Sequence, residues 1–175
     1  EDNFPKTETQ VQMEKFLGKK KVESFRKPMG LVTSPSGLLF VADMDAGNVH
    51  VLDFAASKMS LYFTEGSIGA PLGLALDRRG FLYVSDGYSK QVFVFDADRK
   101  PVMGIGKGEL GKPTFLAIDE ELGRLYVSDV VKHVVVVFDL NSGQKLFSFG
   151  GKGNGEGEMH GPQGLAIDKK GQIFV

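Results

Sequence analysis

Short runs of apolar residues, separated by turns rich in glycine and aspartate, follow one another from residue 28 to the end of the chain. The runs are rich in valine, phenylalanine, leucine and tyrosine, which suit the surface of a pleated sheet. In some runs, such as 134–138, apolar and polar positions barely alternate, which is typical of a strand buried on both faces. Helical spacing of apolar positions is absent from residue 28 onward, so the pattern predicts an all-β fold.

These runs belong to a regular repeat. Asp43, Asp86 and Asp129 close the same motif in three copies, at equal intervals of 43 residues. A second set of aspartates follows ten residues later at the same interval, and each copy opens with a proline. The second set is Asp53, Asp96 and Asp139, and the opening prolines are Pro28, Pro71, Pro113 and Pro162. A fixed period of this length indicates that one supersecondary unit is repeated along the chain.

Each complete copy contains four predicted strands joined by hairpin turns. The predicted strands are 30–34, 38–43, 49–54 and 58–64 in the first copy, 73–77, 81–85, 91–96 and 101–105 in the second, and 115–119, 124–128, 133–139 and 144–149 in the third. The fourth copy supplies 164–167 and 172–175. Four strands in a period of this length are typical of a β-propeller blade. The sequence therefore predicts a β-propeller of four-stranded antiparallel blades, with an incomplete ring of three full blades and part of a fourth.

The blades divide the chain into 28–70, 71–112, 113–161 and a partial 162–175, preceded by a lead-in over 1–27. The lead-in is compatible with a short helix, with Thr9 as N-cap and Gln12 in the capping-box position. It is equally compatible with an outer strand that closes a blade. We expect the aspartates that end the second strand of each blade to accept backbone N–H groups of the next turn.

Charge and residue types narrow the possible functions. The net charge of -1 disfavours binding to nucleic acid, and the absence of cysteine excludes disulfides and cysteine nucleophiles. His50, His133 and His160 occupy three different registers of the repeat, which predicts that they do not share one rim or channel. No GxSxG or HExxH motif is present. We therefore expect no enzymatic activity, no metal site and no cofactor.

A binding surface is expected where inter-blade links and the turns between second and third strands meet. The turns at 45–48, 87–90 and 130–133 fall on that rim. Its candidate binding residues form a mixed aromatic and cationic set, which suits a peptide or an acidic protein surface. They are Tyr88, Lys90, Lys132 and His133.

Phe115 is a further candidate binding residue. The other copies place Gly30, Gly73 and Gly164 at this register, near the start of the innermost strand. An aromatic side chain there is expected to project toward the mouth of the central channel. It would either plug the channel or anchor a hydrophobic ligand.

The segment GLALDRRGFLYVSDGYSKQVFVFD and its neighbours resemble the NHL repeat, whose blades read approximately PxGIAVDxxGxIYVADxxNHRIQVFD. The resemblance covers 28–175 and implies a propeller, in most members six-bladed. The Asn-His pair that names the repeat is kept only in part, as Lys132-His133 in the third copy. The lead-in resembles that of exported bacterial six-bladed NHL proteins. This implies an extracytoplasmic location, periplasmic or secreted.

Together these features predict a noncatalytic scaffold that binds a protein or peptide partner on the rim. Two alternatives remain: a propeller hydrolase or lyase whose metal-binding residues lie in further blades, and an RNA-binding NHL module. We expect no membrane span, because no apolar run is long enough to cross a bilayer. Three and a half blades leave open apolar faces, so we expect a fragment of a longer protein or self-association through those faces.

Overall fold

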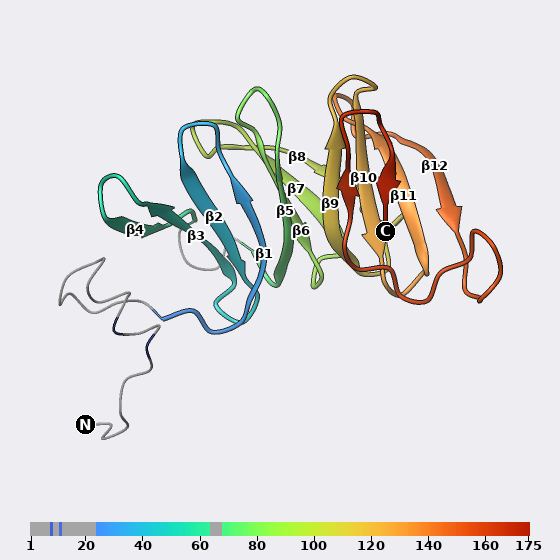
Figure 1. Ribbon diagram of the computed structural model, residues 1–175, viewed down its shortest axis with the longest axis horizontal. Helices are drawn as coiled ribbons and strands as arrows, with labels where there is room; N and C mark the ends of the chain where they lie inside the picture. Colours follow the sequence, from blue (N-terminus) through green and yellow to red (C-terminus); the bar gives the residue numbers. More distant parts are fainter. Residues whose placement is uncertain (1–7, 9–10, 12–23, 64–67) are drawn as a thin grey trace.

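A computed structural model describes residues 8, 11, 24–63 and 68–175 of the chain. Thr9 and Gln12, on which the predicted helical lead-in depends, lie outside the described residues. Figure 1 shows a row of small twisted sheets that follow one another in chain order, from blue to red. Every pairing within the sheets is antiparallel, which confirms the predicted all-β blade architecture.

Three sheets have four strands each, and the strands of each sheet pair in chain order. The first sheet contains β1 (Pro28–Thr33), β2 (Leu38–Asp43), β3 (Asn48–Asp53) and β4 (Lys58–Leu61). The second contains β5 (Pro71–Leu76), β6 (Leu82–Asp86), β7 (Gln91–Phe95) and β8 (Pro101–Ile105). The third contains β9 (Pro113–Asp119), β10 (Arg124–Asp129), β11 (Val134–Asp139) and β12 (Lys145–Gly150). β13 (Ala166–Ile167) and β14 (Ile173–Phe174) form a two-stranded sheet.

The innermost strands of the three four-stranded sheets begin earlier than the sequence predicts. Pro28 pairs with Asp43 and Pro71 pairs with Asp86, in each case across a break in register. Proline has no N–H to donate to a ladder, so it is tolerated at a strand start beside such an irregularity. In the first three repeats the opening proline is thus the first residue of the inner strand, whereas β13 begins at Ala166, four residues after Pro162.

The fourth strand of the first sheet ends earlier than predicted, at Leu61 instead of residue 64. The next two residues turn into the core instead of continuing along the sheet edge. The N–H of Tyr62 donates to the carbonyl of Val49 at 2.7 Å, and the Tyr62 ring lies 6.0 Å from that of Phe95 in the second sheet. The buried side chains of Tyr62 and Phe63 therefore pack the end of the first sheet against Phe95 of the second.

Apolar side chains fill the three spaces between successive sheets. Phe40, Val51, Leu74 and Val84 are buried between the first and second sheets, and Tyr83, Val94, Leu125 and Phe138 between the second and third. Ala117, Tyr126, Val135 and Val137 pack against the β13–β14 pair. Because the second and third sheets each supply one face to each of two spaces, their central strands show little apolar–polar alternation.

The inner strands approach one another so closely that two positions, Gly30 and Gly73, require glycine. A Cβ atom placed on Gly73 would collide with the carbonyl oxygen of Thr114 in the third sheet. Ser85 and Ser128 also link neighbouring sheets: the Ser85 hydroxyl donates to Thr114 O, and the Ser128 hydroxyl donates to Gln163 O at 2.8 Å. The repeat therefore contains polar contacts between blades as well as apolar packing.

Candidate binding rim

The antiparallel strand order sends two sets of connections to one end of the sheets. The β2–β3, β6–β7 and β10–β11 turns lie at this end, together with the links that join one sheet to the next. The β1–β2, β5–β6 and β9–β10 turns lie at the opposite end (Figure 1). We call the first end the rim, and define it by turns 44–47, 87–90 and 130–133, links 68–70 and 106–112, and loop 151–161.

A buried aspartate fixes each turn of the rim to the adjacent link. Asp86 accepts the backbone N–H of Gly69 at 2.9 Å and of Ala70 at 3.0 Å, both in the preceding link. It also accepts the N–H of Tyr88 in its own turn at 2.8 Å. Asp129 repeats this pattern with Gly111, Lys112, Val131 and Lys132. The expected capping role of these aspartates is confirmed, and it extends to the links.

Asp43 holds the first turn in the same way and lies near a buried histidine. Burial opposes ionisation of this carboxylate. The N–H groups of Lys27, Arg26 and Ala46 and the nearby His50 outweigh that effect and hold the pKa of Asp43 below its ordinary value. Nε2 of His50 lies 3.3 Å from Asp43 Oδ2, but neither ring nitrogen of His50 makes a hydrogen bond among the described contacts. His50 is therefore buried in the first sheet and does not lie on the rim.

The rim is continuous from one sheet to the next. A Cβ atom placed on Gly47 would lie 3.0 Å from the carbonyl oxygen of Ile68 in the first link. In that link, a Cβ atom on Gly69 would lie 2.9 Å from the Tyr88 side chain in the second turn. Turn, link and turn thus lie in direct contact, and the aspartates hold them in place.

Tyr88 and Lys90 both lie in the β6–β7 turn. The Tyr88 side chain is 81% exposed although it packs against Gly69 along one edge. Lys90 has a φ of 58°, a backbone conformation that side-chain-bearing residues seldom adopt and that ends this tight turn. Its side chain is exposed. The structure therefore displays an aromatic and a cationic group on one turn of the rim.

Lys132 and His133 occupy the corresponding part of the third sheet. His133 has a φ of 60°, at the same register as Lys90. The Lys132 ammonium donates to the carbonyl of Glu109 in the second link at 2.5 Å. Val131, beside it, is exposed. The third turn therefore adds to the rim an apolar side chain and a cation that is hydrogen-bonded to the second link.

The structure brings together two histidines that the sequence places in different registers. The rings of His133 and His160 are 5.9 Å apart between centroids. Gly161 donates its N–H to Nδ1 of His133 at 3.0 Å, and Gly151 donates its N–H to His133 O at 2.9 Å. The prediction that the histidines do not share one rim is therefore wrong for this pair. Repeat register could not show the contact, because it forms when loop 151–161 folds back over the turn.

Phe115 lies in β9 and is half-buried. Its N–H donates to the Ser128 hydroxyl at 2.9 Å within the third sheet, and its Cα lies close to Gly73 of the second sheet. It is separate from the exposed turns that carry Tyr88, Lys90 and Lys132. Its role as a channel plug or a ligand anchor stays a prediction.

Among the described residues, no group of three or more histidine, aspartate or glutamate side chains has the arrangement that a metal ion needs. Within the same part of the chain, no helix has the length and apolar character that crossing a membrane requires.

No protein-family model matches the sequence. A curated relative, the protein SUPPRESSOR OF QUENCHING 1, chloroplastic, of Arabidopsis thaliana, is 28% identical over a 155-residue alignment that covers 69% of this chain and 15% of the relative. This chain thus corresponds to a small part of that protein.

Solved structures share the arrangement of sheets. A catalytically inactive virginiamycin B lyase from Staphylococcus aureus with quinupristin has a TM-score of 0.69 at 15% identity, over 88% of this chain and 50% of that one. Hydrazine synthase from Kuenenia stuttgartiensis has a TM-score of 0.64 at 22% identity, over 87% and 43% of the two chains. A nidogen/laminin complex has a TM-score of 0.61 at 19% identity, over 72% and 48%. The fold is an incomplete β-propeller. The matches span half or less of these proteins.

The comparisons correct one expectation. The expectation that the sequence excludes enzymatic activity is wrong, because virginiamycin B lyase, an enzyme, has the same fold. The nidogen/laminin complex shows the fold in a protein assembly. The propeller therefore accommodates both catalysis and protein binding, and the fold alone does not select between them.

Proposed function

We propose that this chain supplies NHL-type propeller blades whose rim binds a peptide or protein segment rich in acidic residues. The rim displays Tyr88, Lys90 and Lys132 on neighbouring turns. The one residue between Tyr88 and Lys90 in the sequence is the uncharged Ser89. Exposed aromatic and cationic side chains on a rigid surface are the groups that dominate affinity in protein interfaces. The single observation that supports the proposal most strongly is the 81% exposure of Tyr88 on a turn held by Asp86.

A rigid turn favours binding because little conformational entropy is lost when the partner arrives. Asp86 joins the Tyr88 turn to link 68–70, and Gly69 supports one edge of the ring. The free face of the ring is thereby presented in a fixed orientation. The chain of the nidogen/laminin complex that shares this fold provides a precedent for a propeller within a protein assembly.

The test is selection of peptides from a random display library on the immobilised chain, followed by calorimetry with the enriched peptides. We expect acidic peptides, with affinity at least about tenfold lower for Tyr88→Ala and reduced for Lys90→Glu. The matched control is Val102→Ala, which removes an exposed apolar side chain from the outer strand β8. Equal affinity for Tyr88→Ala and Val102→Ala would contradict the proposal.

A second candidate function is catalysis at the same rim, and it is supported by the His133–His160 pair. Imidazoles act as general acids or bases near neutral pH, and they are common zinc ligands. A Zn²⁺ titration followed through the histidine ring signals in NMR tests the metal-dependent form of this candidate. Stoichiometric binding that is lost in His160→Gln would support it, and ring signals that do not respond to Zn²⁺ would remove it.

A further inference from the structure

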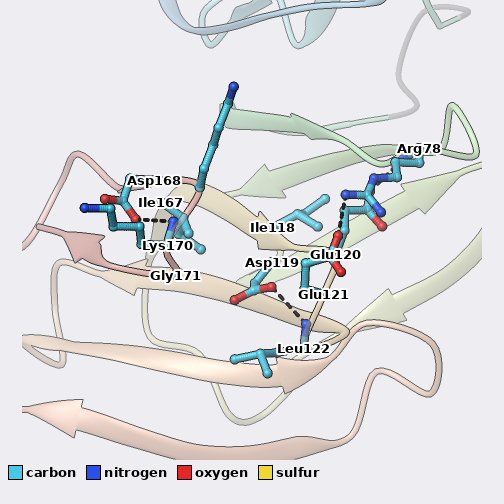
Figure 2. Close-up of a pocket in the computed structure, with 11 residues that line it drawn as sticks. Arg78, Ile118, Asp119, Glu120, Glu121, Leu122, Ile167, Asp168, Lys170 and Gly171 are labelled. Atoms are coloured by element: carbon cyan, nitrogen blue, oxygen red, sulfur yellow. Dashed lines mark hydrogen bonds and ion pairs between the residues drawn. The ribbon is translucent and has the colours of Figure 1, made fainter.

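A cleft of about 710 Å³ lies at the end of the sheets opposite the rim. It is formed by the β9–β10 turn and the β13–β14 turn, and Arg78 reaches it from the β5–β6 turn (Figure 2). The side chains of Ile118, Leu122 and Ile167 give it an apolar lining. Charged groups of both signs surround this lining, so the cleft suits a ligand that carries charge on an apolar stem.

Asp119 is the most buried charged residue of the cleft, with an exposed fraction of 8%. Its Oδ1 accepts the N–H of Leu122 at 2.9 Å. Its Oδ2 points toward the Gly171 turn, and no described group forms a hydrogen bond or an ion pair with it (Figure 2). Oδ2 is not among the fully buried atoms, so a ligand that enters the cleft can reach it, and burial of the rest of the side chain strengthens its attraction for a cation.

The other acidic side chains of the β9–β10 turn are already occupied. Glu120 accepts the backbone N–H of Arg78 at 2.6 Å, and Glu121 accepts from the Arg78 guanidinium at 2.6 Å. Arg78 is therefore held away from Asp119 by its own two partners. Among the carboxylates of this turn, Asp119 is the most buried and is the one that Arg78 does not bind.

The second sheet shows which ligand this register binds. Asp77 stands there at the position of Asp119, and its Oδ2 accepts from Nε of Arg79 at 2.8 Å and lies 2.6 Å from Nη2. The guanidinium of Arg79 also stacks on the Phe81 ring, 4.4 Å from its centroid. One turn of this protein therefore already binds a guanidinium group through the carboxylate equivalent to that of Asp119.

The third sheet keeps the carboxylate but lacks its arginine. Gly80 and Gly123 occupy equivalent places in the two turns, so Leu122 stands where Arg79 stands in the second sheet. Leu122 is 58% exposed, and its side chain has no group that could donate a hydrogen bond to Asp119 Oδ2. The site is thus present without the internal group that fills it in the neighbouring blade.

We propose that this cleft binds an arginine side chain of a protein or peptide partner, with Asp119 Oδ2 accepting from the guanidinium. The apolar residues of the cleft then contact the methylene stem, as arginine stems commonly pack on apolar surface. Lys169 and Lys170 also line the cleft and oppose any additional positive charge. The partner therefore presents a single arginine flanked by neutral or acidic residues. This site is independent of the rim.

The test uses an end-capped Gly-Asp-Arg-Gly peptide and the same peptide with citrulline, which has the shape of arginine without its charge. We expect calorimetry to give at least about tenfold tighter binding of the arginine peptide. In NMR, the amide signals of Leu122 and Gly171 should shift, and those of the rim should not. Equal affinity for the two peptides would overturn the proposal.

Two variants test the role of Asp119. Asp119→Asn keeps an oxygen for the Leu122 N–H but removes the charge, and we expect it to weaken arginine-peptide binding about tenfold. Leu122→Arg supplies an internal guanidinium and should also weaken binding. Glu156→Gln, the same kind of change at an exposed site in loop 151–161, is the matched control. Unchanged affinity in Asp119→Asn would contradict the proposal. If Asp119→Asn does not fold, the citrulline comparison and Leu122→Arg decide it.

Failure of this site is distinguishable from failure of the rim. Tyr88→Ala should leave arginine-peptide binding unchanged, because Tyr88 lies at the opposite end of the strands. Loss of arginine-peptide binding in Tyr88→Ala would instead assign that peptide to the rim and overturn the cleft proposal.

Discussion

Nε2 of His50 lies 3.3 Å from Oδ2 of Asp43, and both side chains are buried in the first sheet. The phenyl ring of Phe25 meets the imidazole edge-on, with 4.7 Å between centroids. The second sheet places Phe93 at the position of His50, and the third places Val136 there. The first blade thus places a histidine beside the aspartate that all three blades share, where the other two blades carry an apolar side chain.

Asp43 makes stability depend on acid pH. Its pKa in the folded state lies below the ordinary value of 3.8, because its hydrogen bonds with backbone N–H groups outweigh the effect of burial. Its stabilisation is therefore complete above about pH 5 and is lost as the pH falls through and below the ordinary value. We expect Asp43→Asn to cost about 1–3 kcal/mol at pH 7 and to flatten the acid limb of stability. Urea unfolding between pH 3 and 7 measures both effects. An unchanged acid limb in Asp43→Asn would contradict this assignment.

Tyr83 makes stability depend on alkaline pH. Burial first, and then the nearby Asp77 carboxylate, raise the pKa of Tyr83 to about 12. The phenol therefore stabilises the fold fully below the unfolded value of about 10 and loses this contribution as the pH rises toward 12. Unfolding free energies between pH 9 and 11.5 should fall less steeply in Tyr83→Phe than in the parent chain. Identical slopes would show that Tyr83 titrates normally.

Gly73 should be irreplaceable for steric reasons. A Cβ there would collide with Thr114 O and approach the Cα of Phe115 at 2.8 Å, and neither is the end of a flexible side chain. We expect Gly73→Ala to cost about 2–3 kcal/mol in urea unfolding. Gly164 holds the same register and would meet nothing within 4 Å, so Gly164→Ala is the control and should change stability by less than about 0.5 kcal/mol. Equal costs would mean that the inner strands are not in close contact.

Ser128 should contribute to the contact between the third and fourth sheets. Its hydroxyl donates to Gln163 O at 2.8 Å and accepts the N–H of Phe115 at 2.9 Å. Ser128→Ala removes the partner of these part-buried backbone groups, and we expect a loss of about 1–2 kcal/mol. In addition, hydrogen exchange at Ile167 and Ile173 should accelerate. The exposed Ser148→Ala is the control, and matching exchange rates in the two variants would argue against this contact.

The sequence predicts the blades well because their signals are local. Glycine and aspartate at fixed positions mark the turns, and strands β2 and β3 differ from prediction by no more than one residue at either end. The end of β4 was not predictable in this way. Tyr62 and Phe63 suit a strand as well as a core, and their position depends on contact with Phe95 in another blade.

The candidate sites were predicted less completely, because they depend on contacts between connections. Exposed turns such as the one carrying Tyr88 follow from strand order. The His133–His160 contact depends on how loop 151–161 folds back, and glycine-rich sequence does not specify that path. The cleft beside Asp119 depends on two turns of neighbouring blades. Its one sequence signal is that Leu122 stands before the turn glycine of the third blade, where Arg79 stands in the second blade.

The central claim is that the rim formed by links and β-turns is the binding surface of these blades. Hydrogen–deuterium exchange with and without a selected acidic peptide tests it most directly. The account predicts protection at residues 87–90 and 130–133, with strands β4, β8 and β12 unchanged, and loss of that protection in Tyr88→Ala. Protection confined to the outer strands, or retained in Tyr88→Ala, would contradict it.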